Sequence, residues 1–127
     1  FWDVEHYLRL RDRAVAADPE QGAKPIIPGL MPVTSLRQVQ RMVELSGCAL
    51  QDDLAERLRT AAGDGPEENR AAVREVGIDL TTRMCERLIA EGVPCLHFNT
   101  LNFSKATHEV LTNLSMAPAP GVTAGRI

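Results

Sequence analysis

The fold is decided by a short apolar stretch, Pro25-Ile26-Ile27-Pro28-Gly29-Leu30-Met31-Pro32-Val33. The stretch is too short for a helix, and its prolines would interrupt helical hydrogen bonding. Runs that are apolar on both faces are typical of strands in a parallel sheet that is covered by helices. We therefore expect residues 26–31 to form a buried strand that ends in a proline-constrained loop.

A second stretch has the same character and turns polar towards its C-terminal end: Cys95-Leu96-His97-Phe98-Asn99-Thr100-Leu101-Asn102. Around the two stretches, apolar residues recur at helical spacing, which predicts helices over about 4–17, 36–46, 53–61, 66–91 and 105–114. The expected N-caps are Asp3, Thr34 or Ser35, Asp52 or Asp53, and Ser104, with Pro66 in the first turn of the fourth helix and Gly77 at a close packing contact.

The alternation of buried strands with amphipathic helices indicates an α/β fold. Two such strands cannot complete a sheet, because each would leave backbone edges and apolar faces uncovered. Phe1 and Trp2, which stand directly before a helix cap, resemble the end of a further strand. The sequence therefore reads as about three βα units, whereas a (β/α)₈ barrel needs eight units and about 250 residues.

The composition limits the class of protein. Of the 127 residues, 44% are apolar and 24% are charged, and the net charge is −3, which argues against a nucleic-acid-binding surface. There is no run of about 18 apolar residues that would predict a membrane span. Cys48, Cys85 and Cys95 are odd in number and widely spaced, so neither a disulfide framework nor a metal site is indicated. We expect a cytoplasmic protein that binds neither nucleic acid nor membrane.

Ligands of parallel sheets bind at the carboxyl ends of the strands, here residues 30–34 and 99–104. The end of the second strand offers more side chains that could contact a ligand. Hydrogen-bonding and apolar residues are mixed there: His97, Asn99, Thr100, Leu101, Asn102 and Phe103. An apolar wall with polar anchors suits a flat heterocycle. The alternative is that alternate strand residues only fill core layers, while Asn102 and Ser104 cap a helix.

Three segments of the sequence resemble motifs of a known protein family: Phe1-Trp2-Asp3-Val4, Ile27-Pro28-Gly29-Leu30-Met31-Pro32-Val33-Thr34 and Leu96-His97-Phe98-Asn99-Thr100-Leu101-Asn102. Together they resemble the C-terminal portion of methylenetetrahydrofolate reductase, over residues 1–114. The composition from Ser115 on is rich in Pro, Gly, Ala and Thr, which predicts a disordered tail over residues 115–127. The resemblance implies a partial, helix-rich (β/α)₈ TIM barrel made of its C-terminal βα units. It also implies that FAD is bound and that NAD(P)H donates a hydride. The substrate would be 5,10-methylenetetrahydrofolate and the product 5-methyltetrahydrofolate, which is used in methionine synthesis. The complete protein would form a homo-oligomer.

The resemblance selects four substrate-binding residues. Leu101 matches the family residue that lines the stacked nicotinamide or folate ring. Asn99 stands where the family usually has Tyr, Phe103 where many members have Arg, and Met42 where an aromatic residue is common. Asn99 thus removes stacking surface, and Phe103 removes a cation that could meet a ligand carboxylate or phosphate. The family's acidic catalytic residue and most FAD contacts precede the position of Phe1, so we expect no catalytic residue in this chain.

Two functions remain open. The chain could be the C-terminal part of a flavin-dependent reductase, inactive alone and active only with the upstream barrel strands. It could instead be a catalytically incomplete remnant that acts as an assembly piece through its open sheet edge. The preference for NADH or NADPH is equally open.

Overall fold

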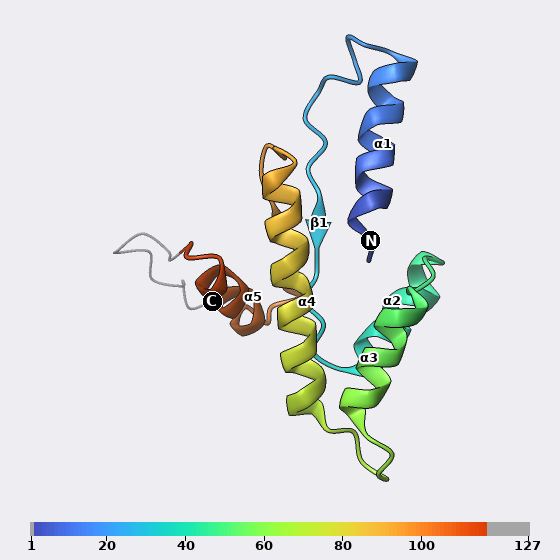
Figure 1. Ribbon diagram of the computed structural model, residues 1–127, viewed down its shortest axis with the longest axis vertical. Coiled ribbons are helices and arrows are strands. Elements are labelled where there is room, and N and C mark those ends of the chain that lie inside the picture. Colours follow the sequence, from blue (N-terminus) through green and yellow to red (C-terminus); the bar gives the residue numbers. More distant parts are fainter. Residues whose placement is uncertain (1, 117–127) are drawn as a thin grey trace.

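The computed structural model describes residues 2–116, which form helices and two short strands (Figure 1). The elements follow in the order α1 (Val4–Ala17), β1 (Gly29–Leu30), α2 (Leu36–Ser46), α3 (Asp52–Ala62), α4 (Arg70–Ala90), β2 (His97–Phe98) and α5 (Lys105–Asn113). The helix-rich α/β class expected from the sequence is confirmed.

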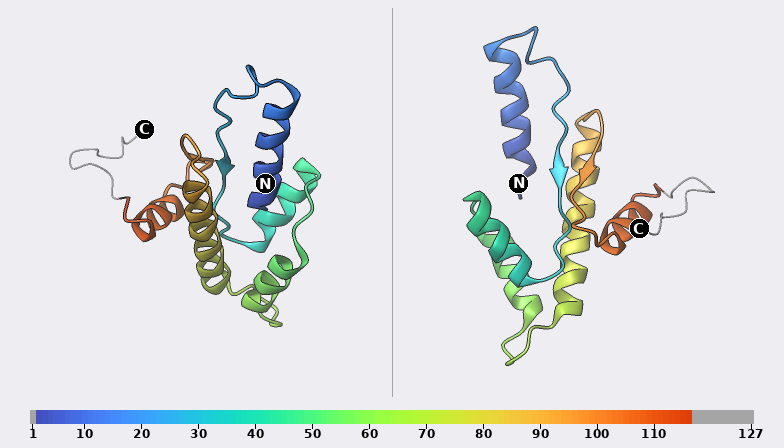
Figure 2. Two further views of the ribbon diagram at one scale, coloured as in Figure 1. Left: turned by 45° about the horizontal axis from the view of Figure 1, so that its top comes forward. Right: turned by 180° about the vertical axis from the view of Figure 1, so that it is seen from behind.

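The two strands pair in parallel, with Gly29 opposite His97 and Leu30 opposite Phe98. Figure 2 shows them side by side next to α4. Both are shorter than the expected 26–31 and 95–102, so those bounds were wrong. Pro28 and Pro32 have no N–H to donate to a neighbouring strand, and no third strand among residues 2–116 offers Ile26 or Ile27 a partner.

Helix caps explain where most helices begin. Asp3 accepts a hydrogen bond from Glu5 N (2.9 Å) at the start of α1, and Ser35 Oγ accepts one from Gln38 N (3.2 Å) at the start of α2. Gly47 ends α2 in the left-handed conformation at φ 65°. The two N-caps, Asp3 and Ser35, were predicted from the sequence and are confirmed.

Two further predictions of helix starts were wrong, whereas the prediction of Ser104 as an N-cap is confirmed. Gln51 is the N-cap of α3 and makes no side-chain cap bond, while Asp52 and Asp53 lie in the first turn, where their charge favours the helix dipole. The fourth helix begins at Arg70, because Asn69 Oδ1 accepts from Ala72 N (3.2 Å); Pro66 lies in the loop before it. Ser104 is the N-cap of α5 but makes no side-chain cap bond.

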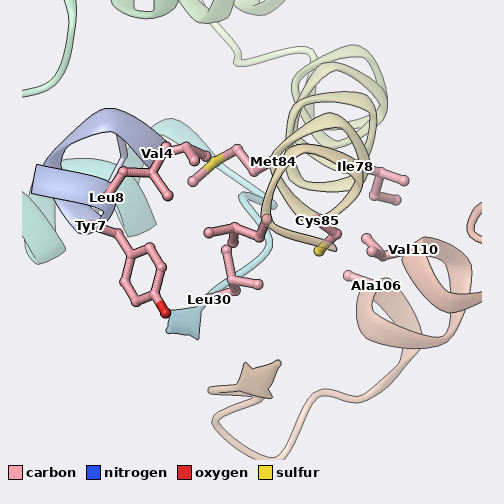
Figure 3. Close-up of a cluster of buried hydrophobic side chains, with 10 residues drawn as sticks. Val4, Tyr7, Leu8, Leu30, Ile78, Met84, Cys85, Ala106 and Val110 are labelled. Atoms are coloured by element: carbon pink, nitrogen blue, oxygen red, sulfur yellow. The ribbon is translucent and has the colours of Figure 1, made fainter. Parts of the chain in front are cut away.

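The core has two clusters that share α4. The first joins α1, β1, α4 and α5, and Figure 3 shows side chains of α1 and α4 converging near Leu30. Its buried members are Val4, Tyr7, Leu8, Leu30, Ile78, Met84, Cys85, Leu88, Ala106 and Val110. The second joins the loop after β1 to α2, α3 and α4, through Val33, Val39, Leu54, Leu58, Ala62 and Val73. Helix α4 therefore fixes the position of β1 and of the loop that follows it.

The described part of the chain ends directly after α5. Met116 N donates to Leu111 O (2.8 Å) and Ser115 N donates to Thr112 O (2.9 Å), which closes the end of α5. The remainder of the expected tail, residues 117–127, lies outside the described part, as does Phe1 of the expected strand end. None of the helices described is long and apolar enough to cross a bilayer.

Candidate functional site

The carboxyl ends of β1 and β2 lie together because the strands are parallel. Asn99 N donates to Leu30 O (2.8 Å), which brings the segment after β2 beside the segment after β1. The Asn99 side chain lies over Gly29, since a Cβ at Gly29 would stand 3.4 Å from Asn99 Nδ2. A Cβ at position 29 would thus be in ordinary contact with the amide at the end of the neighbouring strand.

A tight turn follows Asn99. Phe103 N donates to Thr100 O (2.8 Å), and the two residues between them, Leu101 and Asn102, have φ of 47° and 67°. Positive φ at both central positions is characteristic of a type I′ turn, and a side chain held there costs about 1–3 kcal/mol. The turn leaves the side chains of Leu101 (59% exposed) and Phe103 (80% exposed) on the surface beside the strand ends.

A pocket of about 340 Å³ lies between the strand ends and the C-terminal half of α2. We call it the Trp2 pocket; its lining residues are Trp2, Gly29, Met31, Met42, Leu45, Ser46, Cys48, Asn99 and Leu101. An indole, two thioethers and two leucines give it a predominantly apolar wall. Such a surface suits a flat ring system.

A smaller pocket of about 250 Å³ lies on the other side of the same two residues, Asn99 and Leu101. We call it the Gln38 pocket; its lining residues are Pro32, Thr34, Gln38, Asn99, Thr100, Leu101, Phe103 and Ala106. Uncharged hydrogen-bonding groups stand here among apolar walls. The two pockets therefore adjoin along Asn99 and Leu101.

All four residues selected from the sequence line these pockets. Asn99 and Leu101 line both, Met42 lines the Trp2 pocket and Phe103 lines the Gln38 pocket. Of the other polar residues at this strand end, Thr100 lines the Gln38 pocket, whereas His97 is exposed and lines neither.

Trp2, Gln38 and Cys48 are among the pocket residues that were not predicted from the sequence. Trp2 had been interpreted only as the end of a strand. Gln38 has a periodic signal, because Gln38, Met42 and Leu45 recur at i, i+4 and i+7 and so share one face of α2. That face lines both pockets, and the helical period of α2 could have revealed it.

Neither pocket is lined by a charged side chain. The nearby N-terminus of α2 is also occupied, because Leu36 N donates to Glu68 Oε1 (2.9 Å) and Gln38 N donates to Ser35 Oγ. A cofactor pyrophosphate requires cations or free helix N–H groups. These pockets therefore fit uncharged rings and do not fit the pyrophosphate of FAD. Among residues 2–116, no cluster of His, Cys, Asp or Glu could hold a metal ion.

A further pocket of about 470 Å³ lies away from the strand ends, between α4 and α5. Arg74 spans it with a bidentate contact to Glu109, at 2.6 and 2.8 Å. This hydrogen bonding lowers the pKa of Glu109 and raises that of Arg74. The wall also carries Glu75, Asp79 and Glu86, so this cavity is polar and charged, unlike the two pockets at the strand ends.

Comparison with known proteins gives a consistent result. A 5,10-methylenetetrahydrofolate reductase of Escherichia coli is 30% identical over 118 residues, which cover 93% of this chain and 37% of that protein. Methylenetetrahydrofolate reductase (NADH) 1 of Zea mays is 36% identical over 92 residues, or 72% of this chain and 15% of that protein. Methylenetetrahydrofolate reductase 1 of Schizosaccharomyces pombe is 31% identical over 116 residues, or 91% and 18%.

The chain thus spans less than two fifths of the length of each of these relatives. The family model described as methylenetetrahydrofolate reductase matches residues 1–115, which include both strands, all five helices and both strand-end pockets. This chain belongs to the methylenetetrahydrofolate reductase family.

Proposed function

We propose that the chain supplies one wall of the substrate site of a methylenetetrahydrofolate reductase. The observation that carries the proposal is the convergence of Asn99, Leu101, Met42 and Phe103 on two adjoining pockets at the strand ends. The pockets are uncharged and apolar, as binding of a nicotinamide or folate ring requires. The relatives' names support reduction of 5,10-methylenetetrahydrofolate as the activity.

In the proposed reaction, NAD(P)H provides a hydride that reaches the methylene carbon of 5,10-methylenetetrahydrofolate. The bond between that carbon and N10 breaks, N10 gains a proton, and 5-methyltetrahydrofolate and NAD(P)⁺ are formed. The part of this chain in the reaction is to bind and orient rings and to exclude water from them. Neither pocket is lined by a carboxylate, a histidine or a lysine, so the proton is supplied from elsewhere.

FAD, implied by the family resemblance, would carry the hydride between the two substrates. Because the strand-end pockets do not fit its pyrophosphate, we propose that FAD is held by barrel strands other than β1 and β2. The two described strands would be the C-terminal members of a (β/α)₈ barrel with residues 1–114 as part of that domain. In support, the sheet within residues 2–116 consists of the two strands β1 and β2, whereas a barrel needs eight strands.

Location and assembly complete the proposal. The three cysteines of the chain are free thiols, which supports a reducing compartment such as the cytoplasm. A homo-oligomer is proposed from the family resemblance alone.

A second candidate function rests on the open sheet. β1 and β2 each have one neighbour, and Phe103 and Ile27 are 80% and 51% exposed. These features would also suit an assembly piece without catalytic activity, which binds a partner through its sheet edge.

The two functions are separated by one assay. The intact gene product is incubated with NADH or NADPH and 5,10-methylenetetrahydrofolate, and 5-methyltetrahydrofolate is quantified by chromatography. The reductase proposal predicts product with at least one donor. It also predicts that the purified 127-residue chain is colourless and inactive. No product from the intact gene product would favour the assembly function, and a yellow, NADH-oxidising 127-residue chain would contradict the placement of FAD on other strands.

A further inference from the structure

Helix α2 provides one wall of both strand-end pockets, yet few of its side chains reach the core. Val39 is its one fully buried residue, whereas α4 has eight. Leu36 and Val43 are half-buried against the second core cluster. Hydrophobic packing therefore constrains α2 less than α4. The residues that α2 contributes to the pockets are Gln38, Met42, Leu45 and Ser46.

The N-terminus of α2 is held by a residue from a distant part of the chain. Leu36 N, the first N–H of the helix, donates to Glu68 Oε1 at 2.9 Å across 32 positions of sequence. The first N–H groups of a helix have no partner within the helix, and a carboxylate beside them also interacts favourably with the helix dipole. Because the N-cap Ser35 accepts from Gln38 N, Glu68 provides a second, long-range cap.

The backbone around Glu68 is itself fixed on both sides. Asn69 N donates to Ala62 O (3.0 Å) at the end of α3, and Asn69 Oδ1 accepts from Ala72 N at the start of α4. Arg70 N donates to Glu68 O (2.9 Å). Glu68 thus stands at a hydrogen-bonded junction of α3 and α4, and its carboxylate reaches from this junction to α2.

We propose that Glu68 is a positioning residue of the candidate site. Its hydrogen bond to Leu36 N holds α2 so that the pocket-lining face of the helix meets the ends of β1 and β2. The inference rests on the proposed function and deepens it, because a residue that lines neither pocket then controls ligand affinity. Glu68 acts through α2 and does not touch the ligand.

Loss of the Glu68 carboxylate should shift the population of α2 positions. The part-buried Leu36 N is left without an acceptor, which disfavours the position that α2 has in the structure. The apparent affinity for a ligand falls in proportion to the fraction of molecules in which α2 is in place. Bound ligand restores that position, so the KM rises while kcat at saturation is retained.

Three variants test the hydrogen bond. Glu68→Ala removes the acceptor. Glu68→Gln keeps a carboxamide oxygen at the same reach and removes only the charge, so it should preserve the position of α2. Glu67→Ala is the matched control, because the neighbouring Glu67 is exposed and forms no side-chain hydrogen bond or ion pair within residues 2–116.

Hydrogen–deuterium exchange of the intact gene product, followed by peptide mass spectrometry, tests the positioning without turnover. For Glu68→Ala we expect exchange within residues 36–46 to become about tenfold faster, while residues 4–17 and 105–113 exchange as in the wild type. Glu68→Gln and Glu67→Ala should stay within about twofold of the wild type throughout. Unchanged exchange over residues 36–46, or an equal rise in all three segments, would overturn the inference.

Steady-state kinetics of the same proteins test the consequence for the site. We expect Glu68→Ala to raise the KM for 5,10-methylenetetrahydrofolate about fivefold or more and to leave kcat within about twofold of the wild type. Glu68→Gln should restore the wild-type KM to within about twofold. A fall in kcat at unchanged KM, or a Glu68→Gln protein as impaired as Glu68→Ala, would contradict the positioning role.

Two provisions keep the outcome decisive. If Glu68→Ala does not fold, Glu68→Asp replaces it with the same expectations, because its carboxylate is one methylene group too short to reach Leu36 N. If the wild type forms no 5-methyltetrahydrofolate, the proposed function is contradicted, and the exchange of residues 36–46 alone decides whether Glu68 positions α2.

Discussion

Gly77 of α4 lies directly against the backbone of Val33. A Cβ at Gly77 would stand 2.2 Å from Val33 O and 2.7 Å from Val33 Cβ, both too close for any side chain. Val33 is buried and lies between Pro32 and Thr34, which both line the Gln38 pocket. This contact therefore positions the loop that carries the candidate site on α4, the longest of the described helices.

Gly77→Ala should destabilise the protein. The substitution improves helix propensity by about 1 kcal/mol, but forcing a Cβ against backbone in a packed interior costs about 1–3 kcal/mol or more. Because the neighbouring atoms include the Val33 carbonyl, which cannot rotate away, we expect a net loss of about 1–2 kcal/mol. Urea unfolding followed by circular dichroism measures this loss.

Gly65→Ala is the control for this prediction. The nearest atom to a Cβ at Gly65 is Glu67 O at 3.9 Å, an ordinary contact, so stability should change by a few tenths of a kcal/mol at most. Equal unfolding midpoints for wild type and Gly77→Ala would show that α4 and the loop after β1 do not pack as described.

Asn99→Tyr should improve ligand binding. Asn99 lines both strand-end pockets, and an aromatic ring at this position would add stacking surface to each. We expect a lower KM for the folate substrate or for the nicotinamide donor. His97→Tyr is the control, because His97 is exposed and lines neither pocket. If Asn99→Tyr and His97→Tyr both leave the KM values unchanged, position 99 is not part of the ligand wall.

The three thiols should react differently with iodoacetamide. Burial, and to a lesser extent the charge of Glu86, raises the pKa of Cys85 to about 11, so this thiol stays protonated at pH 8 and does not react in the folded protein. Cys48 and Cys95 are exposed and should be alkylated. Because Cys48 lines the Trp2 pocket, 5-methyltetrahydrofolate should protect Cys48 and leave Cys95 reactive.

Peptide mass spectrometry after timed alkylation identifies the labelled thiol. Equal protection of Cys48 and Cys95 would mean that the ligand does not occupy the Trp2 pocket. Labelling of Cys85 at pH 8 without denaturant would contradict its burial in the first core cluster.

The Arg74–Glu109 pair should make stability depend on pH. Hydrogen bonding by Arg74 lowers the pKa of Glu109 in the folded state below its usual value near 4.5. The pair therefore stabilises the protein above about pH 4.5, and the stabilisation is lost as the pH falls through the lowered pKa. Glu109→Gln should lower the urea midpoint at pH 7, and its difference from the wild type should shrink at pH 3.

Glu75→Gln is the matched control, because Glu75 lines the same cavity and forms no ion pair within residues 2–116. Its unfolding midpoint should remain close to that of the wild type at both pH values. A difference for Glu109→Gln that is as large at pH 3 as at pH 7 would mean that its cause is not the charge of Glu109.

Local patterns were sufficient to predict much of the fold. The helical spacing of apolar residues predicted all five helices, and Gly77 stood out as a glycine inside a long helix where only close packing explains it. The strand lengths could not be predicted, because pairing depends on neighbours that a local pattern does not contain. Ile26 and Ile27 have the composition of a strand, but no strand among residues 2–116 pairs with them.

The candidate site was predicted through Asn99, Leu101, Phe103 and Met42, which the family motifs mark. Gln38 was missed although its helical spacing to Met42 and Leu45 places it on the same face of α2. Trp2 was missed because its position beside Met42 arises from contacts between residues that are distant in the chain, which a local pattern does not contain.

The most direct test of the ligand wall is kcat/KM for 5,10-methylenetetrahydrofolate in Leu101→Ala, measured on the intact gene product. Leu101 is 59% exposed and lines both pockets, so its removal should spare folding and remove apolar contact with the ligand. Leu10→Ala is the control, because Leu10 is 57% exposed and lines neither pocket. We predict a fall of about tenfold or more for Leu101→Ala, with unchanged melting and no effect of Leu10→Ala. An unchanged kcat/KM in Leu101→Ala would contradict the assignment of the strand-end pockets to the substrate.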